Sequence, residues 1–327
     1  MQINSEYARL SVREAAERLL AIENPIVLIH RRPDGDAVGS GAALCEVFRQ
    51  LGKTSAIMCA DKIPSRLEFI LKRLDVSVAK SASGCSSVSI DVASPSQLGA
   101  LVDEMKKPPV FMIDHHAVGE QFADGYIDPE ASSAAEALAD IISELSAMNR
   151  INLTDKLAYA LYAAVSSDTG CFAYSNASTK THRLAAMLIE KGIDAADINH
   201  RLFNSKSDSQ IKAEGFIATK LKSLFSGKLA YATVSIAEME SLGLCAEDFD
   251  TAIDIVRALE GAEIALLVKE NPGSELKASM RSTGADVSAI AKEFGGGGHV
   301  RAAGCSIKAE SLADAANMII EKIKEII

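Results

Sequence analysis

The sequence has no stretch of about 18 consecutive apolar residues, the shortest length typical of a membrane-spanning helix. Its first residues lack the basic head and apolar centre of a signal peptide, and residues 11–20 instead predict an amphipathic helix that begins at a serine cap. The 6 cysteines form no C-x-x-C pair, which disfavours disulfides and zinc–thiolate ligation and favours reduced, buried thiols. We therefore expect a cytoplasmic protein without a membrane partner.

The chain also has few basic residues for a protein that binds long nucleic acid. It carries 34 Lys and Arg against 44 Asp and Glu, a net charge of −10. Binding to long strands depends on many contacts of Lys and Arg with phosphates, so long duplex nucleic acid is not an expected partner. A short, highly charged substrate held by a few basic groups and metal ions remains compatible with this balance.

The 327 residues exceed what one hydrophobic core usually serves, so two domains are expected. From residue 25 to 190, short apolar runs alternate with helical periodicity, which is typical of βαβ units. This α/β pattern predicts a mostly parallel sheet with helices on both faces in residues 1–192, a helical linker over 193–226 and a smaller α/β domain over 227–327. The predicted helices are 37–51, 94–105, 132–148, 154–167, 179–191, 249–259, 287–294 and 312–327, and the later strands are 229–235, 263–268, 276–281 and 302–307.

Acidic and imidazole side chains follow three apolar runs at the point where each run ends. Short apolar runs of this kind predict buried parallel strands, and ligands collect at the carboxyl ends of such strands. A further aspartate follows an apolar helical stretch. The side chains concerned are His30, Asp34 and Asp36 after 25–29, Asp91 after 88–90, Asp114, His115 and His116 after 110–113, and Asp168 after 157–165.

Most of these residues have a structural explanation when taken singly. A D-x-D loop after a strand is often a solvated turn, and a lone aspartate such as Asp91 or Asp168 often caps a helix. Gly39 and Gly41 either leave helix amides open to an anion or allow close packing, and the sequence does not separate the two. The adjacent His115 and His116 resist such an explanation, because two imidazoles beside an acid have no obvious structural use at the end of a buried run.

Taken together, the residues predict one polynuclear metal site, because a parallel sheet brings its strand ends to one edge. Oxygen-rich ligation with some imidazole favours Mn²⁺, with Mg²⁺ or Co²⁺ as alternatives, over a thiolate zinc site. Two divalent cations that share a bridging aspartate and a hydroxide hydrolyse phosphoesters. Ser166 and Ser167 do not indicate a serine hydrolase, because no base-orienting residues surround them in the sequence.

The predicted second domain carries a glycine-rich motif that favours phosphate binding. Gly296, Gly297 and Gly298 precede His299 and Arg301, and Arg281 ends a nearby predicted strand. Glycine lets backbone amides approach a phosphate, and arginine grips it with two hydrogen bonds. The alternative is a flexible turn.

These motifs, in this order, resemble those of the DHH phosphoesterase superfamily. The string H-x-x-P-D-x-D-A-x-G-S from His30, then Asp91, Asp114–His116 and S-D-T-G around Asp168, resembles the RecJ-like catalytic domain. G-G-G-G-H with A-A-G resembles the DHH-associated substrate-binding domain. Nearly the whole chain is covered, and the two-domain form resembles most the NrnA-type branch of oligoribonucleases (nanoRNases) and adenosine 3′,5′-bisphosphate phosphatases.

The resemblance implies a role for each site residue and an active site between the two domains. One cation would be held by His30, Asp34 and Asp91, and the other by Asp36, Asp91, His115 and Asp168, with Asp91 as the bridge. Asp114 would orient the histidines, and His116 would touch the scissile phosphate. The substrate residues would be Arg281, Gly296, Gly297, Gly298, His299 and Arg301.

The chain departs from the pattern of that branch in three places. Gln97 stands where an arginine is usual, Ala117 and Val118 replace a polar pair, and Ala173 replaces an arginine. All three lie near the implied substrate rather than among the implied metal ligands. The resemblance therefore constrains the chemistry more tightly than the substrate.

The leading hypothesis is a Mn²⁺-dependent hydrolase that converts short oligonucleotides to 5′-mononucleotides, with dephosphorylation of adenosine 3′,5′-bisphosphate as an additional activity. A cyclic-dinucleotide or linear-dinucleotide phosphodiesterase is the alternative, since the same site permits it. A RecJ-like exonuclease is disfavoured by the acidic charge and the lack of an oligonucleotide-binding barrel. A pyrophosphatase should have a more basic second domain, and a nucleotide-binding regulator should have broken ligands. The sequence is also compatible with a homodimer.

Overall fold

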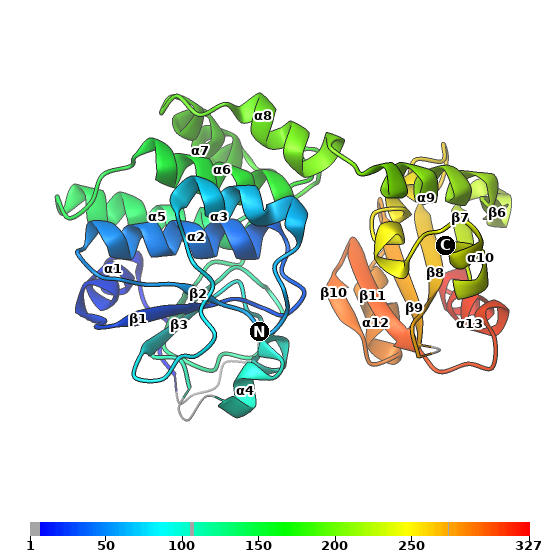
Figure 1. Cartoon of the computed structure of the whole chain (residues 1–327), viewed down its shortest axis with the longest axis horizontal. Helices are drawn as coiled ribbons and strands as arrows, with labels where there is room; N and C mark the ends of the chain where they lie inside the picture. Colours follow the sequence, from blue (N-terminus) through cyan, green and yellow to red (C-terminus); the bar gives the residue numbers. More distant parts are fainter. Residues whose placement is uncertain (1–6, 105–107, 274) are drawn as a thin grey trace. The chain divides into compact units, whose positions relative to one another are not determined.

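The computed structural model describes residues 7–104, 108–273 and 275–327. The first six residues, part of the segment inspected above for a signal-peptide pattern, lie outside the described residues. The chain forms two compact units, Met1–Ser205 and Lys206–Ile327 (Figure 1). Their boundary falls inside the predicted linker 193–226, and the three-part division stays a prediction. In the part of the chain that the structure describes, no helix is long and apolar enough to cross a bilayer.

The first unit contains a five-stranded sheet in the order β2-β1-β3-β4-β5, in which every pairing is parallel. This arrangement confirms the predicted parallel sheet. Because the strands run in one direction and β1, β3 and β4 are neighbours, their carboxyl ends lie side by side at one edge. The strands are β1 (Pro25–Leu28), β2 (Ile57–Met58), β3 (Ser86–Ile90), β4 (Phe111–Asp114) and β5 (Gly125–Ile127).

Helices cover both faces of this sheet, as predicted, but unequally. Alternate strand residues such as Val27 and Val88 face a large core with α1, α2, α3, α5 and α6, whereas Ile26 and Leu28 face a smaller core with η2 and α4 (Figure 1). The helical elements of the unit are α1 (Val12–Ala21), α2 (Gly35–Gln50), η1 (Ser65–Leu67), α3 (Glu68–Leu74), η2 (Pro95–Leu98), α4 (Leu101–Glu104), α5 (Ala134–Ala147), α6 (Asp155–Asp168), α7 (Thr179–Ile189), α8 (Ala195–Asn199) and the π-helical turn η3 (His200–Asn204).

Close packing of α2 against α6 explains Gly39. A Cβ at this position would lie 2.8 Å from the Ala160 carbonyl oxygen and 2.8 Å from the Ala164 Cβ. Helix α2 begins at Gly35, with Asp34 as its cap, so Gly39 lies in the second turn rather than at the open end. Of the two explanations offered by the sequence, packing is the one that the structure supports.

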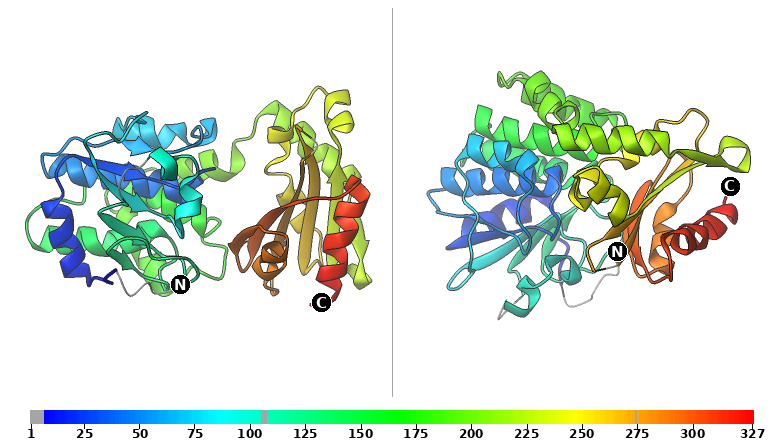
Figure 2. Two further views of the ribbon diagram at one scale, coloured as in Figure 1. Left: turned by 90° about the horizontal axis from the view of Figure 1, so that it is seen from below. Right: turned by 45° about the vertical axis from the view of Figure 1, so that its right-hand side comes forward.

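The second unit contains a six-stranded mixed sheet in the order β10-β11-β9-β8-β7-β6, in which only β7 and β8 pair in parallel. Helices α12 and α13 cover one face and α9, η5 and α11 cover the other; Figure 2 shows α13 in red beside the sheet. The elements are α9 (Asp208–Thr219), β6 (Lys222–Leu224), η4 (Phe225–Gly227), β7 (Leu229–Val234), α10 (Ile236–Ser241), η5 (Ala246–Phe249), α11 (Ile253–Arg257), β8 (Ile264–Asn271), β9 (Glu275–Ser282), α12 (Val287–Glu293), β10 (Gly297–His299), β11 (Ala302–Ile307) and α13 (Leu312–Lys324).

Two predicted helices are wrong in detail. The helix predicted over 94–105 is split by Gly99, whose φ of +61° ends η2 before α4 begins; Met105 lies outside the described residues. The helix predicted over 249–259 is shorter: α11 covers only Ile253–Arg257, and Phe249 instead ends η5. There the Asp248 carboxylate accepts the amide of Cys245 at 2.9 Å and so starts a 3-10 turn earlier in the chain.

Candidate metal centre

The structure brings the predicted metal ligands together at the carboxyl edge of the first sheet. Their donor atoms form the sets His30–Asp34–Asp91 and Asp36–His115–Asp168, and the atoms of each set lie within 4.8 Å of one another. We call these the first and second positions. A third set of the same kind, Asp91–His115–His116, connects them.

Asp91 lies between the two positions and presents a different oxygen to each. Its Oδ2 lies 3.5 Å from His30 Nε2, and its Oδ1 lies 3.7 Å from His115 Nε2. His115 Nε2 is also 3.6 Å from the Oδ2 of Asp168 and 3.9 Å from the Oδ2 of Asp36. This arrangement is the one required of a carboxylate that bridges two cations.

The backbone of Asp91 adopts a left-handed conformation with φ of +58°. Residues other than glycine rarely adopt this conformation, and asparagine and aspartate tolerate it best. The amide of Asp91 donates to the Ile113 carbonyl at 3.0 Å, so the sheet pairing holds the turn in place. Such strain is typical of functional sites, where the surrounding structure maintains it.

Backbone carbonyls orient two of the imidazoles toward the centre. His30 Nδ1 is 2.8 Å from the Arg31 carbonyl oxygen, and His115 Nδ1 is 3.3 Å from that of Ala131. An Nδ1–H that donates to a carbonyl leaves Nε2 as the acceptor, which is the nitrogen that faces the carboxylates. The carbonyl of Ala131 has no sequence signal, and sequence reasoning missed it.

His116 is held differently, by the carboxylate of Asp114. Its Nδ1 lies 2.7 Å from Asp114 Oδ1, and the Asp114 side chain is completely buried. Burial opposes the imidazolium, but Asp114 outweighs this effect and raises the pKa of His116 to about 9. The expected orienting role of Asp114 is therefore compatible with its bond to His116.

Asp36 is fixed by the first turn of α5. Its Oδ2 accepts the amide of Ala134 at 2.6 Å and its Oδ1 accepts that of Ala135 at 3.1 Å. The exposed amides of a helix amino terminus favour a negative charge. Each oxygen retains a lone pair for a further ligand.

The electrostatics of the centre indicate a need for cations. Burial, reinforced by the neighbouring aspartates, raises the pKa of Asp36 and that of Asp168 well above the usual range. For Asp91, burial is outweighed by His30 and the other histidines, which lower its pKa; for His30, burial is outweighed by Asp34 and Asp91, which raise its pKa to about 12. Carboxylates and imidazoles without a thiolate form a donor set that fits hard divalent cations.

We expect divalent-cation binding to release protons and to strengthen as the pH rises. The raised pKa values of His30, Asp36 and Asp168 mean that protons must leave these groups before they can serve as ligands. Calorimetric titration with Mn²⁺ at about pH 6.5 and about pH 8.5, in buffers of different ionisation enthalpy, measures both effects. An affinity that does not change with pH would contradict this account.

We expect Asp168→Asn to stabilise the metal-free protein while weakening its response to Mn²⁺. A raised pKa means that ionising Asp168 at neutral pH costs folding free energy, and asparagine removes that cost, on the order of 1 kcal/mol. Thermal unfolding with and without Mn²⁺ measures both changes. Asp155→Asn is the matched control, because it breaks the ion pair with Arg73 (2.7 Å) and should not stabilise the protein.

The predicted substrate residues of the second unit lie on β9, on β10 and just before it, and in the turn between β10 and β11. In register, His299 of β10 pairs with Ala302 of β11, and Ala302 pairs with Arg281 of β9. The guanidinium Nη1 of Arg301 is buried and has no hydrogen-bond partner among the described residues. The side chain of His299 lies outside the described part of the structure.

The glycine-rich segment forms part of a β-hairpin rather than an open loop. A Cβ at Gly296 would lie 2.2 Å from the Gly304 carbonyl oxygen, and one at Gly298 would lie 2.5 Å from that of Ala302. These two glycines therefore serve close strand packing. Among the residues that the structure describes, none places an atom within 4 Å of the Cβ position of Gly297, so these residues leave space on that side.

Gln97, one of the departures from the family pattern, connects the loops that follow β1 and β3. Its carbonyl accepts the Arg31 amide at 2.7 Å, and its Oε1 accepts the Ala93 amide at 2.6 Å. Ala117 and Val118, a second departure, are exposed. At the third, Ala173 is exposed after Gly170, Cys171 and Phe172, whose φ values of +56°, +57° and +64° make a left-handed turn shortly after Asp168.

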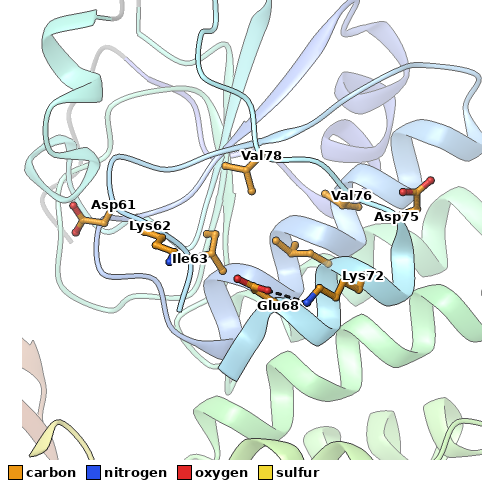
Figure 3. Close-up of a pocket in the computed structure, with 9 residues that line it drawn as sticks. Asp61, Lys62, Ile63, Glu68, Lys72, Asp75, Val76 and Val78 are labelled. Carbon is orange, nitrogen blue, oxygen red and sulfur yellow. Dashed lines mark hydrogen bonds and ion pairs between the residues drawn. The ribbon is translucent and has the colours of Figure 1, made fainter. Parts of the chain in front are cut away.

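A surface pocket of about 430 Å³ lies elsewhere on the first unit (Figure 3). It is lined by residues of α3 and of the segments on either side, and Glu68 pairs with Lys72 at 2.9 Å within it. None of its lining residues belongs to the predicted site. The pocket is therefore separate from the metal centre.

Comparison with known proteins identifies the same family that the sequence motifs resemble. Residues 24–165 match the DHH family, N-terminal domain, and residues 226–325 match the DHHA1 domain. The chain is 32% identical to the bifunctional oligoribonuclease and PAP phosphatase NrnA of Thermus thermophilus over 96% of this chain and 94% of that protein, and 26% identical to NrnA of Bacillus subtilis over 91% and 94%.

A crystal structure of an exopolyphosphatase-related protein from Bacteroides fragilis has the same fold, with a TM-score of 0.84 at 21% identity over 96% of this chain and 95% of that one. The resemblance read from the sequence is thereby confirmed. The chain belongs to the DHH family of phosphoesterases and carries the DHHA1 domain after its catalytic domain.

Proposed function

We propose that this protein is a hydrolase that cleaves short oligonucleotides to 5′-mononucleotides and also dephosphorylates adenosine 3′,5′-bisphosphate, with two Mn²⁺ ions as cofactors. The observation that carries the proposal is the placement of Asp91, with one oxygen toward each of two donor sets. The names of the NrnA relatives support the substrate class. The acidic net charge of −10 agrees with a short substrate rather than a long strand.

The residues that would hold the cations are those of the two positions. His30, Asp34 and Asp91 would hold one, and Asp36, His115 and Asp168, together with Asp91, would hold the other. When bound, such ions supply a water of lowered pKa and neutralise the charge that develops on the phosphoryl oxygens. Mg²⁺ or Co²⁺ could replace Mn²⁺ in an oxygen-rich donor set.

His116 would act on the scissile phosphate. Because Asp114 engages its Nδ1, the substrate would meet the other ring nitrogen, Nε2. With the pKa of His116 raised to about 9, the metal-free protein carries an imidazolium at neutral pH. Its Nε2–H would donate a hydrogen bond to a phosphate oxygen or pass its proton to the departing oxygen.

The second unit would contribute contacts to the nucleotide. Arg281 and Arg301 suit phosphate oxygens, and the buried, unpartnered Nη1 of Arg301 is a donor for such an oxygen. The open side of Gly297 allows close approach of a ligand to the backbone. We propose that Gly296, Gly298 and His299, which belong to the same hairpin, also form part of the nucleotide site, the two glycines by allowing the strand packing that shapes it.

We expect the highest kcat/KM on di- to tetranucleotides and the release of 5′-mononucleotides. The test compares oligonucleotides of increasing length with adenosine 3′,5′-bisphosphate, cyclic dinucleotides and pyrophosphate, all with Mn²⁺. Preference for cyclic dinucleotides would replace the proposal with the alternative activity. Preference for long strands would indicate a RecJ-like enzyme, and nucleotide binding without turnover on any substrate would indicate a regulator.

A further inference from the structure

Residues 131–135 form the end of the connection between β5 and α5 and the first two residues of α5. This short segment contacts two residues of the second position directly. The carbonyl of Ala131 lies 3.3 Å from His115 Nδ1. The amides of Ala134 and Ala135 donate to the two oxygens of Asp36 at 2.6 Å and 3.1 Å. We call residues 131–135 the anchor segment.

The anchor segment also reaches the third residue of the second position through Asn176. The side-chain amide of Asn176 donates to the Ser132 carbonyl at 3.0 Å and to the backbone carbonyl of Asp168 at 3.2 Å. The end of α6, which carries Asp168, is therefore tied to the anchor segment. One five-residue segment thus contacts or supports Asp36, His115 and Asp168.

A single buried carboxylate fixes the anchor segment. The Oε2 of Glu136 accepts the Ser132 amide at 3.1 Å, the Ser132 hydroxyl at 2.5 Å and the Thr181 hydroxyl at 2.8 Å. In return, the Ser133 hydroxyl accepts the Glu136 amide at 3.1 Å as the cap of α5. These four bonds join the start of α5, the segment before it and the start of α7.

Burying the carboxylate of Glu136 costs folding free energy, which indicates a specific role for this side chain. Its side chain has no exposed surface, and the nearest ammonium, that of Lys180, lies 3.9 Å from Oε1 and is shared with Asp128 and Asp140. Oε1 itself makes no hydrogen bond with any residue that the structure describes. A buried carboxylate with incomplete pairing stabilises less than an apolar side chain of equal size.

The first position has different supports. His30 is oriented by the carbonyl of Arg31, within its own loop. Asp34 is fixed as the cap of α2, where its Oδ1 accepts the amides of Asp36 and Ala37 at 3.0 Å each. In the described part of the chain, neither residue makes a hydrogen bond with the anchor segment.

We propose that Glu136 is a positioning residue for the second cation position and not for the first. It acts through the anchor segment, which holds the imidazole of His115 and the carboxylates of Asp36 and Asp168 in one arrangement. The inference rests on the proposed metal centre. Groups that orient metal ligands in this way typically change metal affinity by about 10- to 100-fold when removed.

The test is calorimetric titration of the metal-free, full-length protein with Mn²⁺. We expect the wild type to bind two ions, and Glu136→Ala to keep one affinity while the other weakens by about 10-fold or more. Glu136→Gln keeps an acceptor oxygen for Ser132 and Thr181, so it should restore most of the lost affinity. The turnover of Glu136→Ala should recover at high Mn²⁺ concentration, because the ligands themselves are intact.

Glu46→Ala is the matched control. Glu46 is also a buried glutamate on a helix of the first unit, but its hydrogen-bond partners are Arg49 and Gln50. We expect Glu46→Ala to leave both Mn²⁺ affinities unchanged. If Glu136→Ala does not fold, Ser132→Ala removes one donor to Glu136 and should weaken the same single site.

The inference is overturned if both affinities of Glu136→Ala equal those of the wild type, or if both weaken together, since that result indicates general loosening. Failure of glutamine to restore binding would also contradict it. If the wild type itself binds no Mn²⁺, the proposed metal centre fails and the inference fails with it. The wild-type titration therefore distinguishes the two failures.

Discussion

Asp91→Asn should reduce kcat/KM on dinucleotides by on the order of 10³-fold or more while leaving the fold intact. Asparagine has nearly the same shape as aspartate and tolerates the left-handed backbone at this position, where φ is +58°. It replaces one carboxylate oxygen by an amide nitrogen, which donates and cannot ligate a cation. Because the two oxygens of Asp91 face different donor sets, the substitution should disturb both positions.

Steady-state rates with Mn²⁺, together with thermal unfolding, check this expectation. The metal-free melting temperature of Asp91→Asn should remain near that of the wild type or change only modestly. Asp91→Ala should be less stable than Asp91→Asn, because alanine is strained at a positive φ. Wild-type turnover by Asp91→Asn at saturating Mn²⁺ would refute a bridging role.

His116→Gln should produce the second largest loss, about 10²- to 10⁴-fold in kcat, with Mn²⁺ binding preserved. Glutamine retains a hydrogen-bond donor for Asp114 but cannot carry the positive charge of an imidazolium. Asp114 holds the Nδ1 of His116 at 2.7 Å, so we expect the substrate to meet this ring at its other nitrogen, Nε2. A loss in kcat without a loss of bound metal separates His116 from the metal ligands.

Parallel measurements of kcat and of Mn²⁺ affinity test this separation. His115→Gln is the matched comparison, because His115 Nε2 lies within 4 Å of Asp36, Asp91 and Asp168 and should lose metal affinity. A shared loss of metal in both variants would show that His116 is also a ligand. Equal activity of His116→Gln and the wild type would remove its proposed role.

Much of the centre could be predicted from the sequence, because most of its residues follow predicted strands. Residues such as His30, Asp91 and His115 follow buried apolar runs, and a parallel sheet places the ends of those runs at one edge. Asp168 is different, because it ends a helix. The joint pattern included it in the predicted site, but an apolar helical stretch gives no rule for where its last residue lies. Its specific role as a ligand of the second cation came only from the family resemblance.

The supports of the centre could not be predicted in the same way. The carbonyl of Ala131 and the amides of Ala134 and Ala135 are backbone groups, which every residue carries, so their use depends on tertiary structure alone. The left-handed turn at Asp91 is likewise invisible in the sequence. Glu136 looks like an ordinary third residue of a helix until its buried bonds to Ser132 and Thr181 are seen.

The structural role of the glycine-rich motif could not be predicted from its composition. Consecutive glycines suggested a loop that approaches phosphate, but Gly296 and Gly298 allow β10 to pack tightly against β11. The broken helix at Gly99 has a similar origin, because one glycine with a positive φ ends a helical turn. In the first case strand packing decides which property of glycine is used, and in the second the left-handed backbone does.

The most direct test of the account is the anomalous difference density of crystals grown with Mn²⁺, measured at the manganese absorption edge. The account predicts two peaks, one among His30, Asp34 and Asp91 and the other among Asp36, His115 and Asp168, with Asp91 contacting both. A single peak distant from Asp91, or no peak at the edge of the sheet, would contradict the central claim.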